Sequence, residues 1–213
     1  MQNVPIYSTW QVDSWRLLSR TELATVRADL ERKAKRSLNT RLNLVIVRLA
    51  CCCGLRVSEI ASLRLDDVRV ADARPHIVIR AAVAKSRRLR RIPLWWDRRT
   101  LETLVEWKQL RVEEGATARD RFVVSAINRT RGKTLTRQAI RQRFRTACKV
   151  LGKSRLESLS IHDGRHTFVS HALAGGRTLA EIRDAAGHAN IVTTSAYLHV
   201  VVREGTPAGQ LFA

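Results

Sequence analysis

The chain has 213 residues, 45% of them hydrophobic and 27% charged, so it is long enough to fold around a sizeable core. Lys and Arg number 39 against 19 Asp and Glu, a formal net charge of +20, which indicates a polyanionic partner such as nucleic acid. The sequence contains neither an apolar run long enough for a transmembrane helix nor a signal-peptide core. We therefore expect a cytoplasmic protein with no membrane partner.

The four cysteines do not indicate a disulfide framework or a metal site. Cys51, Cys52 and Cys53 are consecutive within an apolar run, and Cys148 stands alone. This spacing suits neither paired disulfides nor zinc ligation. We interpret them as small buried side chains in a reducing compartment, and we expect no metal and no cofactor.

Helix signals dominate the first third of the chain. Residues 1–18 have weak periodicity and are predicted to form an extended lead-in. The Ser-Arg-Thr-Glu sequence from Ser19 is a capping box that begins a helix. The apolar run predicts a central helix over 42–53, which Gly54 ends in the left-handed conformation, and a short helix over 58–63 follows.

A small β region comes next. Residues 76–81 are rich in β-branched side chains, and 91–94 form a second short extended segment. Between them, 85–91 is predicted to be a hairpin tip loaded with positive charge. Residues 122–124 predict a further strand. The fold class is therefore α+β, mainly α-helical, with a small antiparallel sheet that carries a basic hairpin.

Capping residues predict the helices of the second half. Asp97 begins a helix over 98–113, Thr136 begins another, and a third covers 162–173. Further on, a capping box at Thr178 begins a helix that ends at Gly187. A last helix is predicted to hold Tyr197. We expect one domain over 19–202 and a C-terminal tail over 203–213.

Three segments carry candidate chemistry. They are Gly-Leu-Arg-Val-Ser-Glu from Gly54, His-Asp-Gly-Arg-His-Thr-Phe from His162, and Gly-His from Gly187, with Tyr197 following soon after. In this order, with a basic hairpin after the first segment, they resemble the tyrosine recombinase (phage integrase) family. The resemblance covers the chain from Ser19 to His199.

The resemblance implies a recombinase catalytic domain, with Glu59 in a supporting role and with six catalytic residues: Arg56, Lys85, His162, Arg165, His188 and the nucleophile Tyr197. It implies a site-specific recombinase that cleaves DNA through a 3′-phosphotyrosine and leaves a free 5′-hydroxyl. We expect double-stranded DNA as the partner, association into a tetramer on DNA, and a location on the nucleoid. The tail is expected to dock on a neighbouring protomer.

These residue types also suit the chemistry on their own. Arginine forks hold the charge of a phosphodiester and of its transition state. Tyr197 can attack phosphorus, Lys85 is the candidate general acid for the 5′-oxygen, and His162 and His188 can donate or move protons. One phosphodiester is exchanged for another, so no ATP is implied.

Each candidate also has a plain structural interpretation. Arg56 can form a surface salt bridge with Glu59, Lys85 can be one phosphate contact among several, and Tyr197 can be an ordinary half-buried residue. His162 lies one helical turn from another histidine, but no carboxylate or cysteine follows at metal-site spacing. The order of the whole set favours the catalytic interpretation. Packing or helix hydrogen bonding is the role expected of two other histidines, His166 and His171.

Basic residues of the hairpin and of one helix face are expected to contact the DNA backbone: Arg87, Arg88, Arg90, Arg91, Arg137, Arg141 and Arg145. For the last three, a solvated helix face is the alternative. Two departures from the family pattern stand out. Gly164 replaces a large apolar residue and is expected to loosen Arg165. Only 18 residues precede the first helix, where family members carry a core-binding domain, so we expect weaker and less selective DNA binding.

Two rival functions remain open at this point. A type IB topoisomerase resembles the family in chemistry and would relax supercoils without a specific sequence. A DNA-binding protein with the recombinase fold but no activity is the other alternative. The intact set of six residues favours the recombinase.

Overall fold

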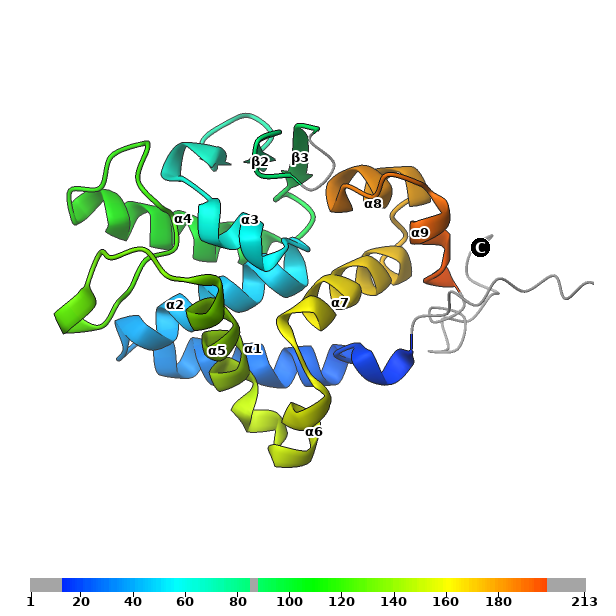
Figure 1. The fold of residues 1–213 in the computed structure, drawn as a ribbon, viewed down its shortest axis with the longest axis horizontal. Helices are drawn as coiled ribbons and strands as arrows, with labels where there is room; N and C mark the ends of the chain where they lie inside the picture. Colours follow the sequence, from blue (N-terminus) through cyan, green and yellow to red (C-terminus); the bar gives the residue numbers. More distant parts are fainter. Residues whose placement is uncertain (1–12, 85–87, 199–213) are drawn as a thin grey trace, which may run out of the picture.

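A computed structural model describes residues 13–84 and 88–198, so Lys85, Arg87 and the tail over 203–213 lie outside the described residues. Figure 1 shows a mainly helical arrangement with a small sheet beside α8, and this confirms the predicted fold class. None of the helices in these residues has the length and hydrophobicity of a membrane span.

The first two helices form as their capping residues predict. The capping box at Ser19 is present and begins α1 (Arg20–Ala34). Helix α2 (Leu38–Val47) begins earlier than expected because the side chain of Ser37 accepts the backbone N–H of Thr40. Its last part, η2 (Arg48–Cys52), is a turn of π-helix, which lies where a plain α-helix was predicted. Gly54 then takes the left-handed conformation, with φ of 65°.

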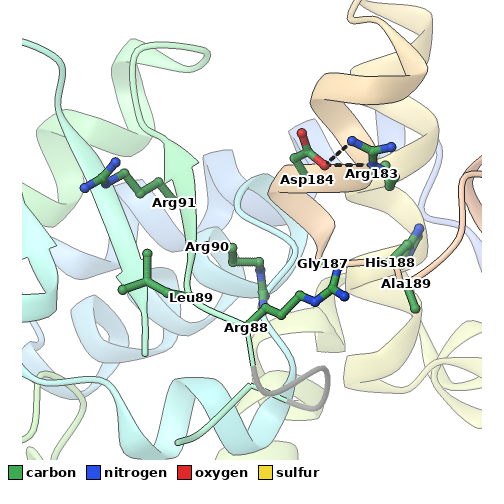
Figure 2. A pocket seen from close by; sticks show the side chains of 9 residues that line it. All are labelled: Arg88, Leu89, Arg90, Arg91, Arg183, Asp184, Gly187, His188 and Ala189. Carbon is green, nitrogen blue, oxygen red and sulfur yellow. Dashed lines mark hydrogen bonds and ion pairs between the residues drawn. The ribbon is translucent and has the colours of Figure 1, made fainter. Parts of the chain in front are cut away.

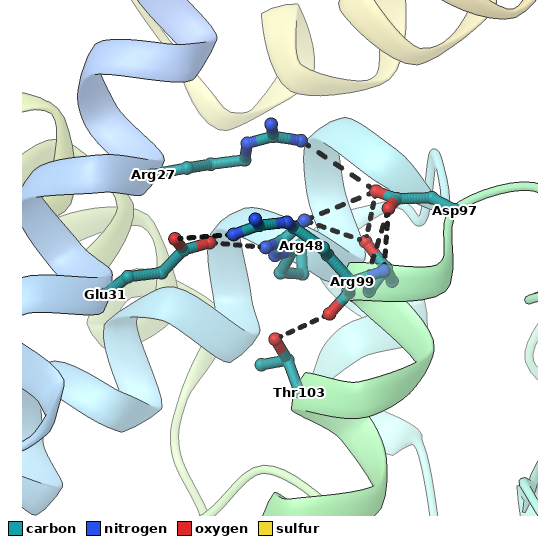
Figure 3. A network of polar contacts seen from close by, with 7 residues as sticks. Arg27, Glu31, Arg48, Asp97, Arg99 and Thr103 are labelled. Carbon is teal, nitrogen blue, oxygen red and sulfur yellow. Dashed lines mark hydrogen bonds and ion pairs between the residues drawn. The ribbon is translucent and has the colours of Figure 1, made fainter.

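A buried arginine in the π-helical turn ties three helices together (Figure 3). Arg48 is 1% exposed and lies between two carboxylates. Its Nη2 donates to Glu31 of α1 at 2.6 Å, and its Nη1 donates to Asp97 at 3.3 Å. Asp97 also caps α4 (Arg98–Glu113), as predicted, by accepting the backbone N–H of Thr100. This network fixes the segment that leads into the Gly54 turn.

The sheet contains β1 (Val68–Arg69), β2 (His76–Ile79) and β3 (Arg90–Pro93) in that order, all antiparallel. The two predicted strands are present with shifted ends. The predicted strand over 122–124 is wrong, because this segment makes a single isolated bridge, between Val124 and Thr134. Its three side chains are all buried, whereas a strand at the surface of a sheet alternates buried and exposed side chains. The indole N–H of Trp107 donates to the carbonyl of Phe122 at 2.7 Å, so this carbonyl already has a hydrogen-bond partner.

The remaining elements complete the helical layers. They are α3 (Val57–Ser62), α5 (Arg137–Ala147), α6 (Lys153–Ser158), α7 (Ile161–Ala174), α8 (Leu179–Ala186), α9 (Val192–Ser195) and the short turns η1 (Ser14–Arg16), η3 (Leu65–Asp67), η4 (Asn128–Thr130) and η5 (Cys148–Leu151). Helix α6 was not predicted. Helix α9 ends before the second tyrosine, so Tyr197 lies in the turn that follows rather than in a helix.

Two apolar clusters share the long helix α7. The larger cluster lies among α1, α2, α4 and α5, and it includes Leu18 at the end of the lead-in. The smaller one joins the second half of α7 to α8 and to the C-terminal turn, and its buried members are Phe168, Val169, Ile182, Ala185, Ala186 and Tyr197. Trp96 packs on this smaller cluster and stacks on Phe168, with ring centroids 6.3 Å apart.

Gly164 allows α7 to approach the π-helical turn closely. A Cβ atom added at Gly164 would lie 3.0 Å from Sγ of Cys51 and 3.1 Å from Cβ of Ala50. The glycine therefore serves close packing, and the expected loosening of Arg165 is not seen, since that side chain is 7% exposed and firmly hydrogen-bonded. Cys51 is buried as predicted, and so are Cys53 and Cys148, while Cys52 is partly exposed.

We expect the substitution Gly164→Leu to lower the free energy of unfolding by about 1–3 kcal/mol, because the larger side chain overpacks the contact with Cys51. Chemical denaturation measures this loss. Ala180→Leu on the exposed side of α8 is the matched control and should change stability by less than about 0.5 kcal/mol. An unchanged unfolding midpoint for Gly164→Leu would mean that the close packing does not require glycine.

Candidate active site

A buried carboxylate organises one wall of the site. The side chain of Glu59 in α3 is fully buried and accepts the backbone N–H of Arg56 at 2.8 Å and its Nη1 at 3.1 Å. From β3, Arg90 donates both Nη atoms to the two carboxylate oxygens, each at 2.8 Å. Burial opposes ionisation of Glu59, but the hydrogen bonds and charges of the two arginines outweigh it and lower its pKa.

Arg165 reaches across the site from α7. Its Nη1 donates to the carbonyl of Gly54 at 2.7 Å, and its Nη2 donates to the carbonyl of Ala186 at the end of α8. Burial and the neighbouring charges of Arg56 and Arg90 lower its pKa to about 9, which leaves the guanidinium charged at neutral pH. Two guanidinium groups, those of Arg56 and Arg165, therefore charge the same small region.

Glycine is required where these contacts meet. Gly54 has φ of 65°, and a Cβ atom there would lie 2.4 Å from the ring of Phe168. Gly187 has φ of 66°, and a Cβ atom there would lie 2.8 Å from Cδ of Arg90. Both turns therefore combine a left-handed backbone with close contact, which only glycine tolerates.

His188 follows the second of these turns. Its Nδ1 is 2.9 Å from the hydroxyl of Thr194, a fully buried residue of α9. Burial, together with the charges of Arg165 and Arg56, lowers the pKa of His188 to about 3, so the ring is neutral at neutral pH. When Thr194 donates to Nδ1, the ring proton lies on Nε2, which is then free to donate.

Tyr197 lies in the smaller apolar cluster and is 4% exposed. Its hydroxyl is hydrogen-bonded to Nδ1 of His166, and the two rings stack with centroids 5.8 Å apart. Burial raises the pKa of Tyr197 to about 12, although the charge of Arg165 acts in the opposite direction. Burial also lowers the pKa of His166.

The structure thus brings four predicted site residues together: Arg56, Arg165, His188 and Tyr197. His162 is exposed on the first turn of α7, close enough to His166 to affect its pKa. Lys85 lies outside the described residues. Sequence reasoning missed the contact of His166 with the tyrosine, which two positions so far apart in the chain do not reveal.

A pocket of about 630 Å³ opens beside the site, between the hairpin and the end of α8 (Figure 2). Its lining contains four arginines and comprises Arg88, Leu89, Arg90, Arg91, Arg183, Asp184, Gly187, His188 and Ala189. Figure 2 shows Arg88 extending toward Gly187 and His188. Asp184 is paired with Arg183 at 2.7 Å, which leaves the pocket a net positive charge.

The basic residues expected on the surface differ in their environments. Arg88 and Arg91 are exposed, and so are the three arginines of the α5 stripe, Arg137, Arg141 and Arg145. Arg90 departs from the expected DNA contact, because its guanidinium is buried against Glu59 and its Nε donates to the carbonyl of Ala185 at 3.0 Å. Its position in β3 puts it on the same inward face as Ile92.

Glu59→Gln tests the role of the buried carboxylate. Because it leaves Arg90 buried without a counter-charge, we expect a loss of about 3–5 kcal/mol in unfolding free energy at neutral pH. The pKa of Glu59 is depressed, so its contribution is present above the ordinary value of 4.5 and is lost as the pH falls through its folded value. The gap between wild type and variant should therefore close in acid.

Denaturation curves of both proteins across this pH range measure the gap. Glu102→Gln, which removes an exposed partner of Arg98, is the control and should have little effect at any pH. A Glu59→Gln variant as stable as the wild type at neutral pH would contradict the assigned role.

Comparisons with known proteins identify the family of this chain. The model of the Phage integrase family matches residues 21–204. The chain is 31% identical over 161 residues to tyrosine recombinase XerC from Pseudomonas fluorescens, which covers 75% of this chain and 48% of that protein. The present chain spans about half the length of the curated relatives that it matches.

Solved structures share the fold at lower identity. The XerA recombinase matches with a TM-score of 0.69 and 23% identity, over 95% of this chain and 65% of its own. The XerH site-specific recombinase, in a post-cleavage complex with its difH substrate, matches with a TM-score of 0.67 and 18% identity. The match covers 92% of this chain and 53% of that protein. The family match covers most of the chain, and on this basis the protein belongs to the phage integrase family of tyrosine recombinases.

Proposed function

We propose that residues 19–202 form the catalytic domain of a site-specific DNA recombinase that cleaves and rejoins DNA through Tyr197. One observation carries the proposal. The buried Tyr197 is near enough to the charged Arg165 for that charge to act on its pKa, and Arg165 is in turn affected by the charge of Arg56 and acts on His188. A tyrosine beside clustered guanidinium groups suits attack on a phosphodiester.

The two arginines bind the scissile phosphate in this proposal. Arg56 is held by Glu59 yet keeps 19% of its side chain exposed, so one edge of its fork remains available. Arg165 is fixed by two backbone carbonyls and keeps its charge at neutral pH. Preorganised charges of this kind stabilise the extra negative charge of the transition state without rearrangement.

The reaction then exchanges one ester for another. The phenol oxygen of Tyr197 bonds to phosphorus as the bond from phosphorus to the 5′-oxygen breaks, and Lys85 supplies the proton that this oxygen needs. His188, neutral at the site, donates from Nε2 to a phosphate oxygen, and exposed His162 offers a second donor. The 5′-hydroxyl of another strand later displaces the tyrosine and restores the phosphodiester.

Exposed arginines supply the proposed contacts with double-stranded DNA. Arg88 and Arg91 lie at the pocket beside the site, and the α5 stripe offers three more exposed guanidinium groups. Contacts of this kind give affinity and salt dependence rather than sequence choice. Tetramer formation on DNA, docking of the tail over 203–213 and association with the nucleoid in the cytoplasm remain part of the proposal.

A covalent complex with DNA tests the proposed chemistry. A nicked suicide substrate, with a core-binding domain supplied where needed, should give a protein–DNA band that resists denaturation. The sequence contains two tyrosines, so Tyr197→Phe should abolish the band while Tyr7→Phe leaves it unchanged. If several substrates give no band with the wild-type protein, the alternative of a DNA-binding protein without activity is favoured. Relaxation of plasmids without a specific sequence would favour a topoisomerase.

Salt titration tests the α5 stripe. Replacing Arg137, Arg141 and Arg145 by alanine should reduce the slope of log binding constant against log salt by about 0.9 for each lost phosphate contact. A control with the same change in net charge replaces three exposed arginines elsewhere: Arg98, Arg119 and Arg129. Equal slopes for the two triple variants would show that the stripe is only a solvated helix face.

A further inference from the structure

Tyr197, the proposed nucleophile, is in contact with a histidine that is not among the six catalytic residues predicted from the sequence. His166 follows Arg165 directly on α7, and its Nδ1 is hydrogen-bonded to the hydroxyl of Tyr197. The two rings also stack, with an angle of 29° between their planes. The imidazole is therefore held against the oxygen that the proposed function makes the nucleophile.

The other histidines of the site are differently placed. Nδ1 of His188 is occupied by the hydroxyl of Thr194, and His162 is exposed at the start of α7. Within residues 13–84 and 88–198, the imidazole that bonds the hydroxyl of Tyr197 is that of His166. A proton leaving this hydroxyl has a direct acceptor there and needs no intervening water.

The electrostatic surroundings keep this acceptor neutral. Besides Tyr197, the charged and titratable groups that act on His166 come from α7 itself, from the turn after α8 and from η1, and they are His162, Asp163, Arg165, His188 and Arg16. Burial has the largest effect, the positive groups add to it, Asp163 opposes it, and the net result is a lowered pKa. A neutral ring whose Nδ1 carries no proton accepts a hydrogen bond from the phenol.

We propose that His166 is the general base for the nucleophile, taking the phenol proton of Tyr197 onto Nδ1 as the phenol oxygen bonds to phosphorus. This inference rests on the proposed recombinase function. The bond from phosphorus to the 5′-oxygen breaks in the same step, and that oxygen receives a separate proton from the general acid. In the rejoining step His166 returns its proton to the departing phenol oxygen, so the histidine ends each exchange unchanged.

The buried position of Tyr197 makes such a base necessary. Burial raises the pKa of its phenol to about 12, so almost no phenolate exists at neutral pH. The same burial keeps bulk water, and therefore hydroxide, away from a side chain that is 4% exposed. A positioned acceptor is then the available route for the proton, and general-base catalysis typically contributes about 10²–10⁴-fold to a rate.

Single-turnover cleavage of two suicide substrates tests the proposal. One carries the normal scissile phosphodiester, and the other carries a 5′-phosphorothiolate, whose sulfur leaves without needing a proton. His166→Asn keeps a polar group near Nδ1 but cannot take up a proton, so cleavage should fall by about 10²–10⁴-fold on both substrates while DNA binding is unchanged. Lys85→Ala should lose activity on the normal substrate and regain it on the sulfur substrate.

The pH profile separates a base from a structural residue. On the sulfur substrate, the wild-type rate should fall as the pH decreases through a midpoint below 6.5, because protonated His166 cannot accept a proton. This measurement uses the wild-type protein, so it tests the proposal even if His166→Asn folds poorly. A thermal melt shows whether that variant is folded. His171→Asn, a half-buried histidine on the same helix, is the matched control and should keep the normal rate and profile.

Three outcomes would overturn the assignment. They are near-normal cleavage by folded His166→Asn, restoration of that variant by the sulfur substrate, and a wild-type profile on this substrate that is flat below pH 6.5. Failure of the recombinase function itself has a different signature, namely no covalent band from the wild-type protein on either substrate. A wild-type band that Tyr197→Phe abolishes preserves that function whatever the result for His166.

Discussion

The carboxylate of Glu59 is the interaction on which the site depends. The guanidinium groups of Arg56, Arg90 and Arg165 lie close enough to affect one another's surroundings, and their mutual repulsion opposes folding. Glu59 is buried among them and pairs directly with the first two. Its position gives the buried Arg90 a direct counter-charge, and its negative charge also partly offsets the repulsion that Arg56 and Arg90 exert on Arg165.

From this carboxylate the arrangement extends through backbone carbonyls. Arg90 links Glu59 to the carbonyl of Ala185, and Arg165 links the Gly54 turn to the carbonyl of Ala186. The end of α8 is thereby fixed to both the sheet and the first glycine turn. His188 lies just beyond this end, so the contacts that the two arginines make with main-chain atoms help to set its place, together with its own hydrogen bond to Thr194.

Much of the fold followed from local patterns in the sequence. The capping residues Ser19, Asp97 and Thr178 begin helices where predicted, because a cap depends on a few neighbouring residues. The π-helical turn was missed, since its extra residue depends on the packing of Arg48 against two other helices. The strand expected at 122–124 failed because continuous burial resembles a strand in sequence whether or not a partner strand exists.

The site divides in the same way. The ordered motifs identified Arg56, Arg165, His188 and Tyr197, which the structure brings together. The role of Arg90 was accessible in principle, because alternation along the strand places it on the inward face with buried Ile92. Charge counting instead grouped it with its exposed neighbours. The contact between His166 and Tyr197 joins residues that are distant in the sequence, so no local sequence pattern predicts it.

The smaller apolar cluster has a consequence for how the protein fails under stress. The tyrosine is anchored among a handful of buried side chains, two of them alanines, whereas most buried apolar residues belong to the larger cluster. Sub-global opening of the C-terminal segment exposes little apolar surface, so it costs far less free energy than complete unfolding. On warming, we expect such a chain to lose the placement of Tyr197 before the large core unfolds. If Tyr197 is the nucleophile, as proposed, activity would then be lost at a lower temperature than the overall fold.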